Sequence, residues 1–193
     1  ADDSIRGLLP IAVFSRYPLT GGRFITYPHS SNCSMLCDIV AGTDTIRLLN
    51  NHLQTTGVSR NRKKWERELT TDNTRREAQA VQDAAETLHE NFVKRAAQTD
   101  SICHLAIAAP HPVLVCGDFN SLPSSYTYRR LSEFLEDGFK TGGHGYMYTY
   151  RYGKRMLRID YAFHSPELEC IDYYSPDLDL CSDHNPVIFT VKY

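Results

Sequence analysis

No stretch of the chain is apolar for long enough to cross a bilayer, which takes about 18 consecutive apolar residues. The longest apolar runs in the 193 residues are short enough to be β-strands, so the sequence predicts a soluble protein without a membrane span. An excess of charge of one sign is also missing, since 21 basic and 23 acidic residues give a formal net charge of −2. This excludes a domain-wide basic field, and a polynucleotide substrate would have to be held locally.

Cysteine is present but lacks the spacing of a zinc or redox motif. No two of the six cysteines are separated by two residues, and six in a chain of this length do not make a small disulfide scaffold. The compartment therefore stays open between the cytoplasm and export. The chain begins with Ala1 rather than Met, without a recognisable signal peptide or tag, which leaves open that its natural start lies elsewhere.

What the chain does contain is an ordinary globular composition, 41% hydrophobic and 23% charged. This composition predicts one domain across residues 1–193 that can bury a core. The sequence has no internal repeat, low-complexity tract or interdomain linker. We expect this domain to be a monomer.

Short runs rich in apolar or β-branched residues and bounded by proline, glycine or asparagine predict β-strands. Such runs lie at residues 11–15, 35–40, 46–52, 113–116, 146–150, 158–163 and 187–191. The run at residues 113–116 is continuously apolar and is followed by glycine, which is typical of a strand buried on both faces in the centre of a sheet.

Two other segments predict helices. Residues 60–99 are charged, alanine-rich and free of glycine, and within them Val81, Ala85, Leu88 and Phe92 are spaced to form one apolar helical stripe. Ser124 or Ser125 can cap a further helix that ends near Leu135. Together with the strands, these helices indicate a layered α/β or α+β architecture.

The most informative segment is Gly-Asp-Phe-Asn at residues 117–120, where the apolar strand ends. Side chains alternate along an extended chain, so Asp118 and Asn120 face one side while Phe119 faces the other. The carboxylate can orient or deprotonate water and the amide can donate to a phosphoryl oxygen, which suits hydrolysis of a phosphate ester. The same residue types also form ordinary turns, and the segment alone does not decide between the two interpretations.

Two later segments offer an acid and a histidine. Residues 158–161 (Arg-Ile-Asp-Tyr) place Asp160 among apolar and aromatic neighbours, where a carboxylate needs a partner unless it faces solvent. Residues 182–186 (Ser-Asp-His-Asn-Pro) offer His184, which can exchange a proton near neutral pH once a carboxylate orients it. Asp160 is our candidate for that carboxylate and Asp183 is the alternative. The alternative is that residues 182–186 form an ordinary loop without a role in a site.

A fourth segment, Asn-Asn-His-Leu at residues 50–53, ends a predicted strand. By the same alternation Asn50 and His52 share a face. A single histidine at a strand end is more often structural, and contact with a substrate is the alternative.

These four segments, in this order, resemble the endonuclease/exonuclease/phosphatase family. The resemblance also takes in residues 11–18 (Ile-Ala-Val-Phe-Ser-Arg-Tyr-Pro), so it runs through nearly the whole chain. Each segment alone is weakly specific, whereas the ordered set is strongly specific. The resemblance implies a deoxyribonuclease I-like, four-layer α/β/β/α sandwich with its active site at one rim of two packed sheets.

The resemblance further implies a metal-dependent phosphoester hydrolase, either a phosphodiesterase or nuclease or a phosphatase. His52 would contact the scissile phosphate, Asp118 would activate or orient water, and Asn120 would support the transition state. Asp160 would orient His184, and His184 would assist at the phosphate.

The cofactor implied is Mg²⁺ (or Mn²⁺), with Asp183 near or on it. In the family an early strand carries an asparagine and the next a glutamate, the principal magnesium ligand, both ahead of the segment matching residues 11–18. The first glutamate here is Glu66, so we expect the chain to be N-terminally incomplete and to lack those strands. Because Mg²⁺ relies on carboxylate oxygens, this piece should be weakly active or inactive, although the parent should be a hydrolase.

The substrate is open between a nucleic-acid end, a lipid headgroup and a small phosphoester. Tyr126 and Arg129, which follow the Gly-Asp-Phe-Asn segment, could stack on a base or bind a second phosphate, or they could form two faces of one helix. A catalytically inactive phosphate-binding or scaffold relative is the alternative to an enzyme.

Overall fold

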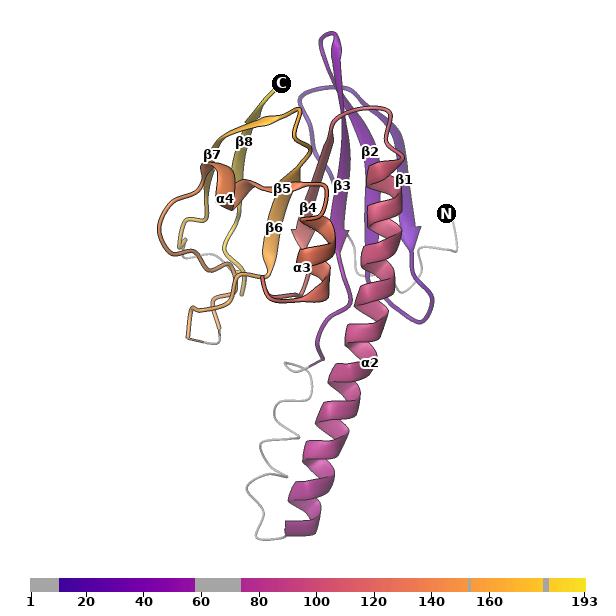
Figure 1. Ribbon diagram of the computed structural model, residues 1–193, viewed down its shortest axis with the longest axis vertical. Helices are drawn as coiled ribbons and strands as arrows, with labels where there is room; N and C mark the ends of the chain where they lie inside the picture. Colours follow the sequence, from indigo (N-terminus) through magenta and orange to yellow (C-terminus); the bar gives the residue numbers. More distant parts are fainter. Residues whose placement is uncertain (1–10, 58–73, 153, 179–180) are drawn as a thin grey trace.

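The structure is a computed structural model that describes residues 11–57, 74–152, 154–178 and 181–193 (Figure 1). Within these residues lie a six-stranded sheet, in the order β1-β2-β3-β4-β6-β5, and a two-stranded sheet of β7 and β8. The strands are β1 (Leu19–Thr26), β2 (Cys33–Ala41), β3 (Asp44–His52), β4 (Val113–Asp118), β5 (Glu136–Asp137), β6 (Asp160–His164), β7 (Glu169–Tyr174) and β8 (Ile188–Lys192). Strands β3 and β4 are parallel, and the other paired strands are antiparallel.

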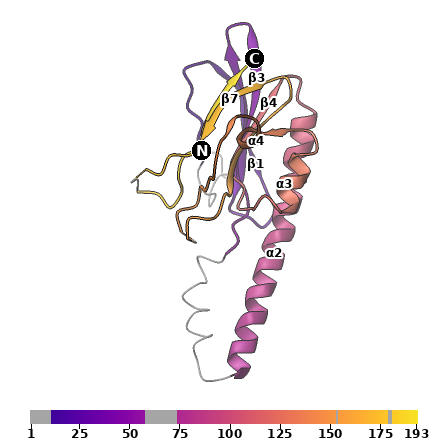
Figure 2. The same ribbon diagram turned by 60° about the vertical axis from the view of Figure 1, so that its left-hand side comes forward.

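Helices cover one face of the six-stranded sheet and the smaller sheet covers part of the other. The long helix α2 (Thr74–Ile107) and the short α3 (Tyr126–Leu131) lie on the same side (Figures 1 and 2). Strands β7 and β8 contact the opposite face, where Tyr173 OH accepts a hydrogen bond from Ala162 N at 3.3 Å and the Phe189 ring lies 5.7 Å from His164. The predicted mixed α/β fold is therefore confirmed, and the full four-layer sandwich stays a prediction.

The core lies between the helices and the six-stranded sheet. The helices contribute Ile102, Cys103 and Leu131 to it, and the strands contribute Leu49 and Val115, all of them buried. Burial of such side chains stabilises the fold by about 1.5–3 kcal/mol each. None of the described helices is both long enough and apolar enough to span a membrane.

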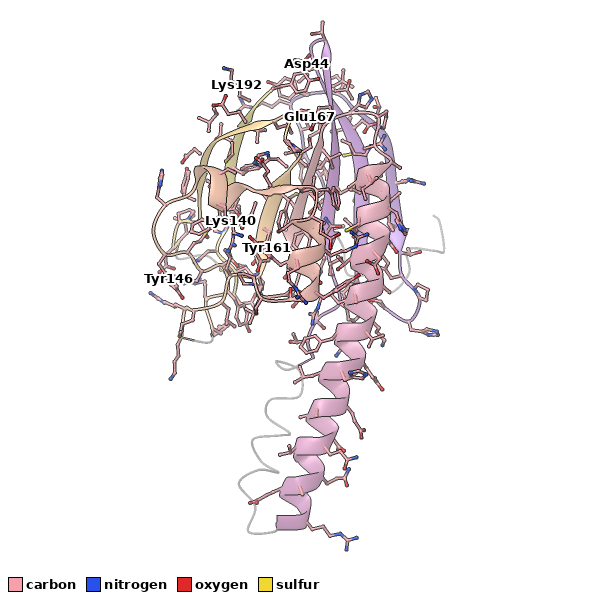
Figure 3. All side chains as sticks on the ribbon, in the orientation of Figure 1. Asp44, Lys140, Tyr146, Tyr161, Glu167 and Lys192 are labelled. Carbon is pink, nitrogen blue, oxygen red and sulfur yellow. The ribbon has the colours of Figure 1, made fainter. Side chains whose placement is uncertain are left out.

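Aromatic rings at the centre of this core fix β4 against β6. The rings of Phe119 and Tyr128 lie 5.4–6.0 Å from those of Tyr161 and Phe163. Tyr161 is labelled in Figure 3, between α3 and the sheet. Because β4 and β6 carry polar residues at their facing ends, the packing of these rings determines where those residues lie.

Most predicted strands are confirmed, but two are wrong. Residues 11–15 do not pair as a strand, and Phe14 is 93% exposed, because no strand of the described residues lies alongside to complete a hydrogen-bonded ladder. Residues 146–150 form isolated bridges at Tyr150 instead of a strand. Strand β1 was not predicted. Two glycines interrupt its pattern, and a bulge accommodates them between Thr20 and Arg23.

The predicted long helix is confirmed in part. The portion before Thr74 lies outside the described residues, and α2 continues past Thr99 to Ile107. The predicted apolar stripe is wrong, since Val81 and Phe92 are 58% and 54% exposed. The N-terminal half of α2 projects beyond the end of the sheet (Figure 1), so Val81 does not reach the core between the helices and the sheet, although Ala80 in the same half is buried.

The second predicted helix is present as α3 with the predicted cap. The Ser125 side chain accepts a hydrogen bond from Tyr128 N at 3.2 Å, which satisfies one amide of the first turn. The helix ends at Leu131 rather than near Leu135. The following segment leads into β5 and α4 (Gly138–Gly142), neither of which the sequence predicted.

Gly117 allows β3 and β4 to approach each other where they end. Its φ of +126° is a backbone conformation that residues with a Cβ rarely adopt. A Cβ there would lie 1.9 Å from the backbone oxygen of Asn51, which is far inside van der Waals contact. The backbone next to Asp118 therefore requires glycine.

We predict that Gly117→Ala destabilises the protein by more than about 4 kcal/mol, in the range reserved for severe lesions, or prevents folding. Gly145→Ala is the matched control, since Gly145 also has a positive φ (+71°) but no atom within 4 Å of its added Cβ. That control should lose only about 1–2 kcal/mol from backbone strain. Thermal unfolding followed by circular dichroism measures both, and equal losses would contradict the close approach at Gly117.

Candidate active site

Three of the predicted site residues lie at the same end of the six-stranded sheet, on neighbouring strands. The pairing registers place His52 opposite Asp118 and Asp118 opposite Asp160. Asp44, labelled at the top of Figure 3, begins β3, so His52 lies at the far end of that strand. These residues line an open cleft of about 1870 Å³. The cleft also receives Asn120 and His184 from the loops that follow β4 and precede β8.

The Asp118 carboxylate is held by Asn120. Asn120 donates its backbone N–H to Asp118 Oδ1 at 2.8 Å and its side-chain amide to Asp118 Oδ2 at 3.0 Å. The same amide nitrogen donates to Leu53 O at 3.0 Å, so its two hydrogens are both engaged. Asn120 has a φ of +47°, a left-handed conformation that asparagine tolerates better than most residues. The loop thus turns back to grip the carboxylate at the end of its own strand.

The second acid is paired with the histidine. Asp160 Oδ2 and His184 Nδ1 are 2.8 Å apart. The buried Thr149 hydroxyl accepts hydrogen bonds from Ile159 N and Asp160 N at 3.0 and 3.1 Å, which fixes the backbone that carries the carboxylate. The His184 ring also lies 5.2 Å from the ring of Tyr150.

A buried ion pair anchors the chain immediately before Asp160. The Arg158 guanidinium donates to both carboxylate oxygens of Asp137, at 3.0 and 2.7 Å, and lies 4.6 Å from the centre of the Tyr161 ring. Both partners are buried, and Tyr128 OH also donates to Asp137 at 2.6 Å. A bidentate pair of this kind adds geometric specificity as well as energy, and here it fixes the start of β6.

Burial and charge raise the pKa of Asp118 well above its usual range. Desolvation is the largest cause and the negative charge of Asp160 the next. The hydrogen bond from Asn120 and the positive charges of His184 and Arg95 act in the opposite direction. A carboxylate disfavoured in this way gains from any cation that enters the cleft.

The two histidines differ in charge. Burial alone would lower the pKa of His184, but the hydrogen bond and charge of Asp160, with the charges of Asp118 and Asp183, raise it to about 9. Burial lowers the pKa of His52, as does the charge of His184. At neutral pH the cleft therefore holds a protonated His184 and a neutral His52, whose Nε2 lies 3.8 Å from Asp118 Oδ2.

The donor set at the base of the cleft suits a divalent cation. Asp118, Asp160 and His184 offer ligand atoms that all lie within 4.8 Å of one another. His184 Nδ1 is engaged with Asp160, so carboxylate oxygens are the donors best able to bind. Each carboxylate oxygen has two acceptor sites, and Mg²⁺ is usually held by one or two carboxylates with waters and substrate oxygens. Asp118 and Asp160 meet that requirement.

The remaining predicted residues lie outside this group of ligand atoms, and two of them line the cleft. Asp183 is exposed and lines the cleft, but it is not part of the group formed by Asp118, Asp160 and His184. Tyr126 also lines the cleft, and its hydroxyl donates to Asp100 at 2.7 Å. Arg129 is exposed and is not among the residues that line the cleft.

Sequence reasoning missed Arg95, Thr149 and Tyr150, all of which contact the site residues or their backbone. Arg95 reads as one of many charged residues on a polar helix, and Thr149 and Tyr150 lie in a tyrosine-rich segment that was predicted as a strand. Only the folded chain brings them to the cleft. No pattern in the sequence alone distinguishes them.

A family model matches most of the chain. The model of the Endonuclease/Exonuclease/phosphatase family aligns with residues 10–184, which include all the site residues described above. No curated protein sequence matches the chain.

Solved structures show the same fold at low sequence identity. An endonuclease/exonuclease/phosphatase from Bacteroides vulgatus is 18% identical, covers 91% of this chain and has a TM-score of 0.62. D. rerio TDP2 humanised by 14 mutations is 15% identical over 92%, with a TM-score of 0.61. The human Nocturnin catalytic domain, solved with a bound sulfate anion, is 18% identical over 91%, with a TM-score of 0.54. This chain spans 66%, 68% and 61% of those three chains, respectively.

The charge of His184 gives a pH prediction for the metal-free protein. Its pKa is raised above the unfolded value of about 6.5, so the pair stabilises the fold fully below that pH and loses this contribution as the pH rises through about 9. In Asp160→Asn, burial without the carboxylate should bring the pKa of His184 to about 6.5 or lower. NMR titration of the imidazole resonances in the presence of a chelator measures this, with the exposed His104 as the internal control. An unchanged His184 titration in the variant would contradict the pairing.

Proposed function

Because the chain belongs to the endonuclease/exonuclease/phosphatase family, we propose that it hydrolyses a phosphoester in the cleft at the end of β3, β4 and β6. The observation that carries this proposal is the convergence of two acid-centred pairs, Asp118 with Asn120 and Asp160 with His184. A phosphoester needs a positioned water, a proton for the leaving oxygen and neutralisation of its own charge. The two pairs offer groups of the right kind for each need.

The proposed reaction begins with a water held by Asp118. The Asp118 carboxylate, held in place by Asn120, can orient the water and take its proton as the new bond to phosphorus forms. The bond from phosphorus to the leaving oxygen breaks, and His184 supplies a proton to that oxygen. The products are an alcohol and a phosphate with one ester bond fewer.

The other residues orient these groups. Asp160 holds the His184 ring so that Nε2 is left to face the substrate, and it stabilises the protonated ring. Neutral His52, next to Asp118, can donate to a phosphoryl oxygen from Nε2. Asn120 donates both amide hydrogens, one to Leu53 O and one to Asp118. It therefore supports the transition state mainly by holding Asp118 in position.

We propose Mg²⁺ or Mn²⁺ as the cofactor, held by Asp118 and Asp160 with Asp183 nearby. Bound there, the ion would offset the negative charge of the phosphoryl oxygens. Two carboxylates that repel each other in a partly buried site support this assignment, because a cation removes the repulsion.

The substrate is proposed only by chemical class. The cleft has a polar base and aromatic side chains along its walls, including Phe92, Tyr126 and Tyr152. A phosphoester that carries a planar or apolar substituent fits that combination, as a nucleic-acid end would, and a lipid headgroup or small phosphodiester remains within the same chemistry. We propose Tyr126 as a substrate contact. Arg129 does not line the cleft and is not proposed as one.

The test is hydrolysis of bis(p-nitrophenyl) phosphate and p-nitrophenyl phosphate with Mg²⁺ or Mn²⁺. We predict that Asp118→Asn and His184→Ala, each made in the full-length protein, lower kcat/KM by at least about 100-fold relative to the unmutated protein, the scale of losing a general base or acid. The exposed Asp172 and His104 give matched controls, Asp172→Asn and His104→Ala, which should retain the parent rate.

Parent-level hydrolysis by both site variants would sink the assignment of roles. A folded full-length protein that binds inorganic phosphate but hydrolyses neither compound, with or without metal, would instead identify a non-catalytic relative.

A further inference from the structure

Arg95 connects the long helix to both loops that carry the site. The side chain is 2% exposed, and its Nη1 donates to Asn120 O at 2.6 Å and to Gln54 O at 2.8 Å. Asn120 follows β4 and Gln54 follows β3, the strands that end in Asp118 and His52. One nitrogen atom therefore ties together the two loops that follow the neighbouring strands β3 and β4.

The loop that Arg95 holds is strained and sets the position of a site carboxylate. Asn120 has a φ of +47°, and its amides grip both oxygens of Asp118. Asparagine tolerates such a conformation better than most residues, and contacts with the surroundings help to hold it. The Asn120 carbonyl accepts a hydrogen bond from the guanidinium, which fixes the residue whose amides hold Asp118.

Burying the Arg95 side chain is energetically unfavourable if its only role is to pack in the core. Within the part of the chain that the structure describes, Arg95 feels the negative charge of Asp118 but forms no direct ion pair with a carboxylate, and its Nη2 has no hydrogen-bond partner. A buried cation that is not directly paired is costly, and an apolar side chain of similar volume usually serves a core as well or better. Residues that are unfavourable for stability, as this buried arginine is, occur most often at functional sites.

We propose that Arg95 is a positioning residue of the active site, which acts by clamping the Asn120 carbonyl so that Asp118 faces the reacting phosphoryl group. It acts through Asn120 and does not contact substrate, since its guanidinium is buried. The inference rests on the proposed function for its effect on rate, and on the geometry alone for its effect on the loop.

The first test is Arg95→Met, which keeps the length of the side chain and removes the clamp. We expect kcat on bis(p-nitrophenyl) phosphate to fall by about tenfold or more, because displacements of about 1 Å cost that much, while KM changes by less than about threefold. Arg95→Lys keeps the charge and one or two of the hydrogen bonds, so its kcat should lie between those of parent and Arg95→Met.

Two variants of α2 serve as matched controls. Lys94→Met removes a charge from the neighbouring position, and Thr99→Val removes a buried hydroxyl one turn further on, bonded to Arg95 O and Thr127 rather than to a site loop. Both should keep the parent kcat, even where Thr99→Val lowers the melting temperature. A merely structural role for Arg95 would give Arg95→Met and Thr99→Val similar effects on rate at similar losses of stability.

Hydrogen exchange gives a readout that needs no turnover. The Asn120 amide, bonded to Asp118 in the parent, should exchange about tenfold or more faster in Arg95→Met and at the parent rate in both controls. A kcat within about twofold of the parent together with an unchanged Asn120 exchange rate would overturn the proposal, as would a rise in KM at constant kcat. If Arg95→Met does not fold, the same two measurements on Arg95→Lys decide.

If the unmutated protein is inactive, the proposed function is wrong, and the hydrogen-exchange rate of the Asn120 amide alone tests the role of Arg95. An active parent with a fully active Arg95→Met would defeat only the clamp.

Discussion

Two carboxylates held side by side at the ends of neighbouring strands are the constraint on which the site depends. The register of β4 and β6 puts Asp118 opposite Asp160, and both are half-buried. Desolvation and the charge of Asp160 destabilise the charged state of Asp118 and raise its pKa, so this carboxylate requires compensation. Asn120 supplies it to Asp118 and protonated His184 to Asp160, and a divalent cation would supply it to both. A phosphoryl group is a chemically suitable ligand for such a centre, because its oxygens could complete the coordination of a bound cation.

The scaffold around this centre is arranged to keep the carboxylates from moving apart. Behind β6, the Arg158 pair with Asp137 and the Thr149 hydroxyl fix the backbone of Asp160. Behind β4, the rings around Phe119 fill the core, and Arg95 holds the loop that turns back onto Asp118. These supports come from α2, β5 and the segment before β6, which are distant from one another in the chain. The cleft is therefore a property of the whole fold rather than of one motif.

The sequence predicted the parts of this picture that are local in the chain. Apolar runs predicted β2, β3, β4, β6 and β8, and the order of the four motifs predicted the family, because each motif lies at or next to one end of a strand. It did not predict β1, where a bulge rescues two glycines, or the exposed stripe of Val81 and Phe92, because helical periodicity cannot tell whether a sheet lies beneath. Arg95 was missed for the same reason. Its importance comes from a contact with Asn120 across 25 positions of sequence.

The central claim is that Asp118 and Asp160 together hold a divalent cation at this rim of the sheet. Titration of Mn²⁺ into ¹⁵N-labelled protein tests it directly, since the paramagnetic ion broadens the signals of nearby amides. The account predicts that the amides of Asp118, Asn120, Asp160 and His184 broaden first, while that of Asp44, at the opposite end of β3, keeps its signal. Broadening that begins elsewhere, or none at all in the folded protein, would contradict it.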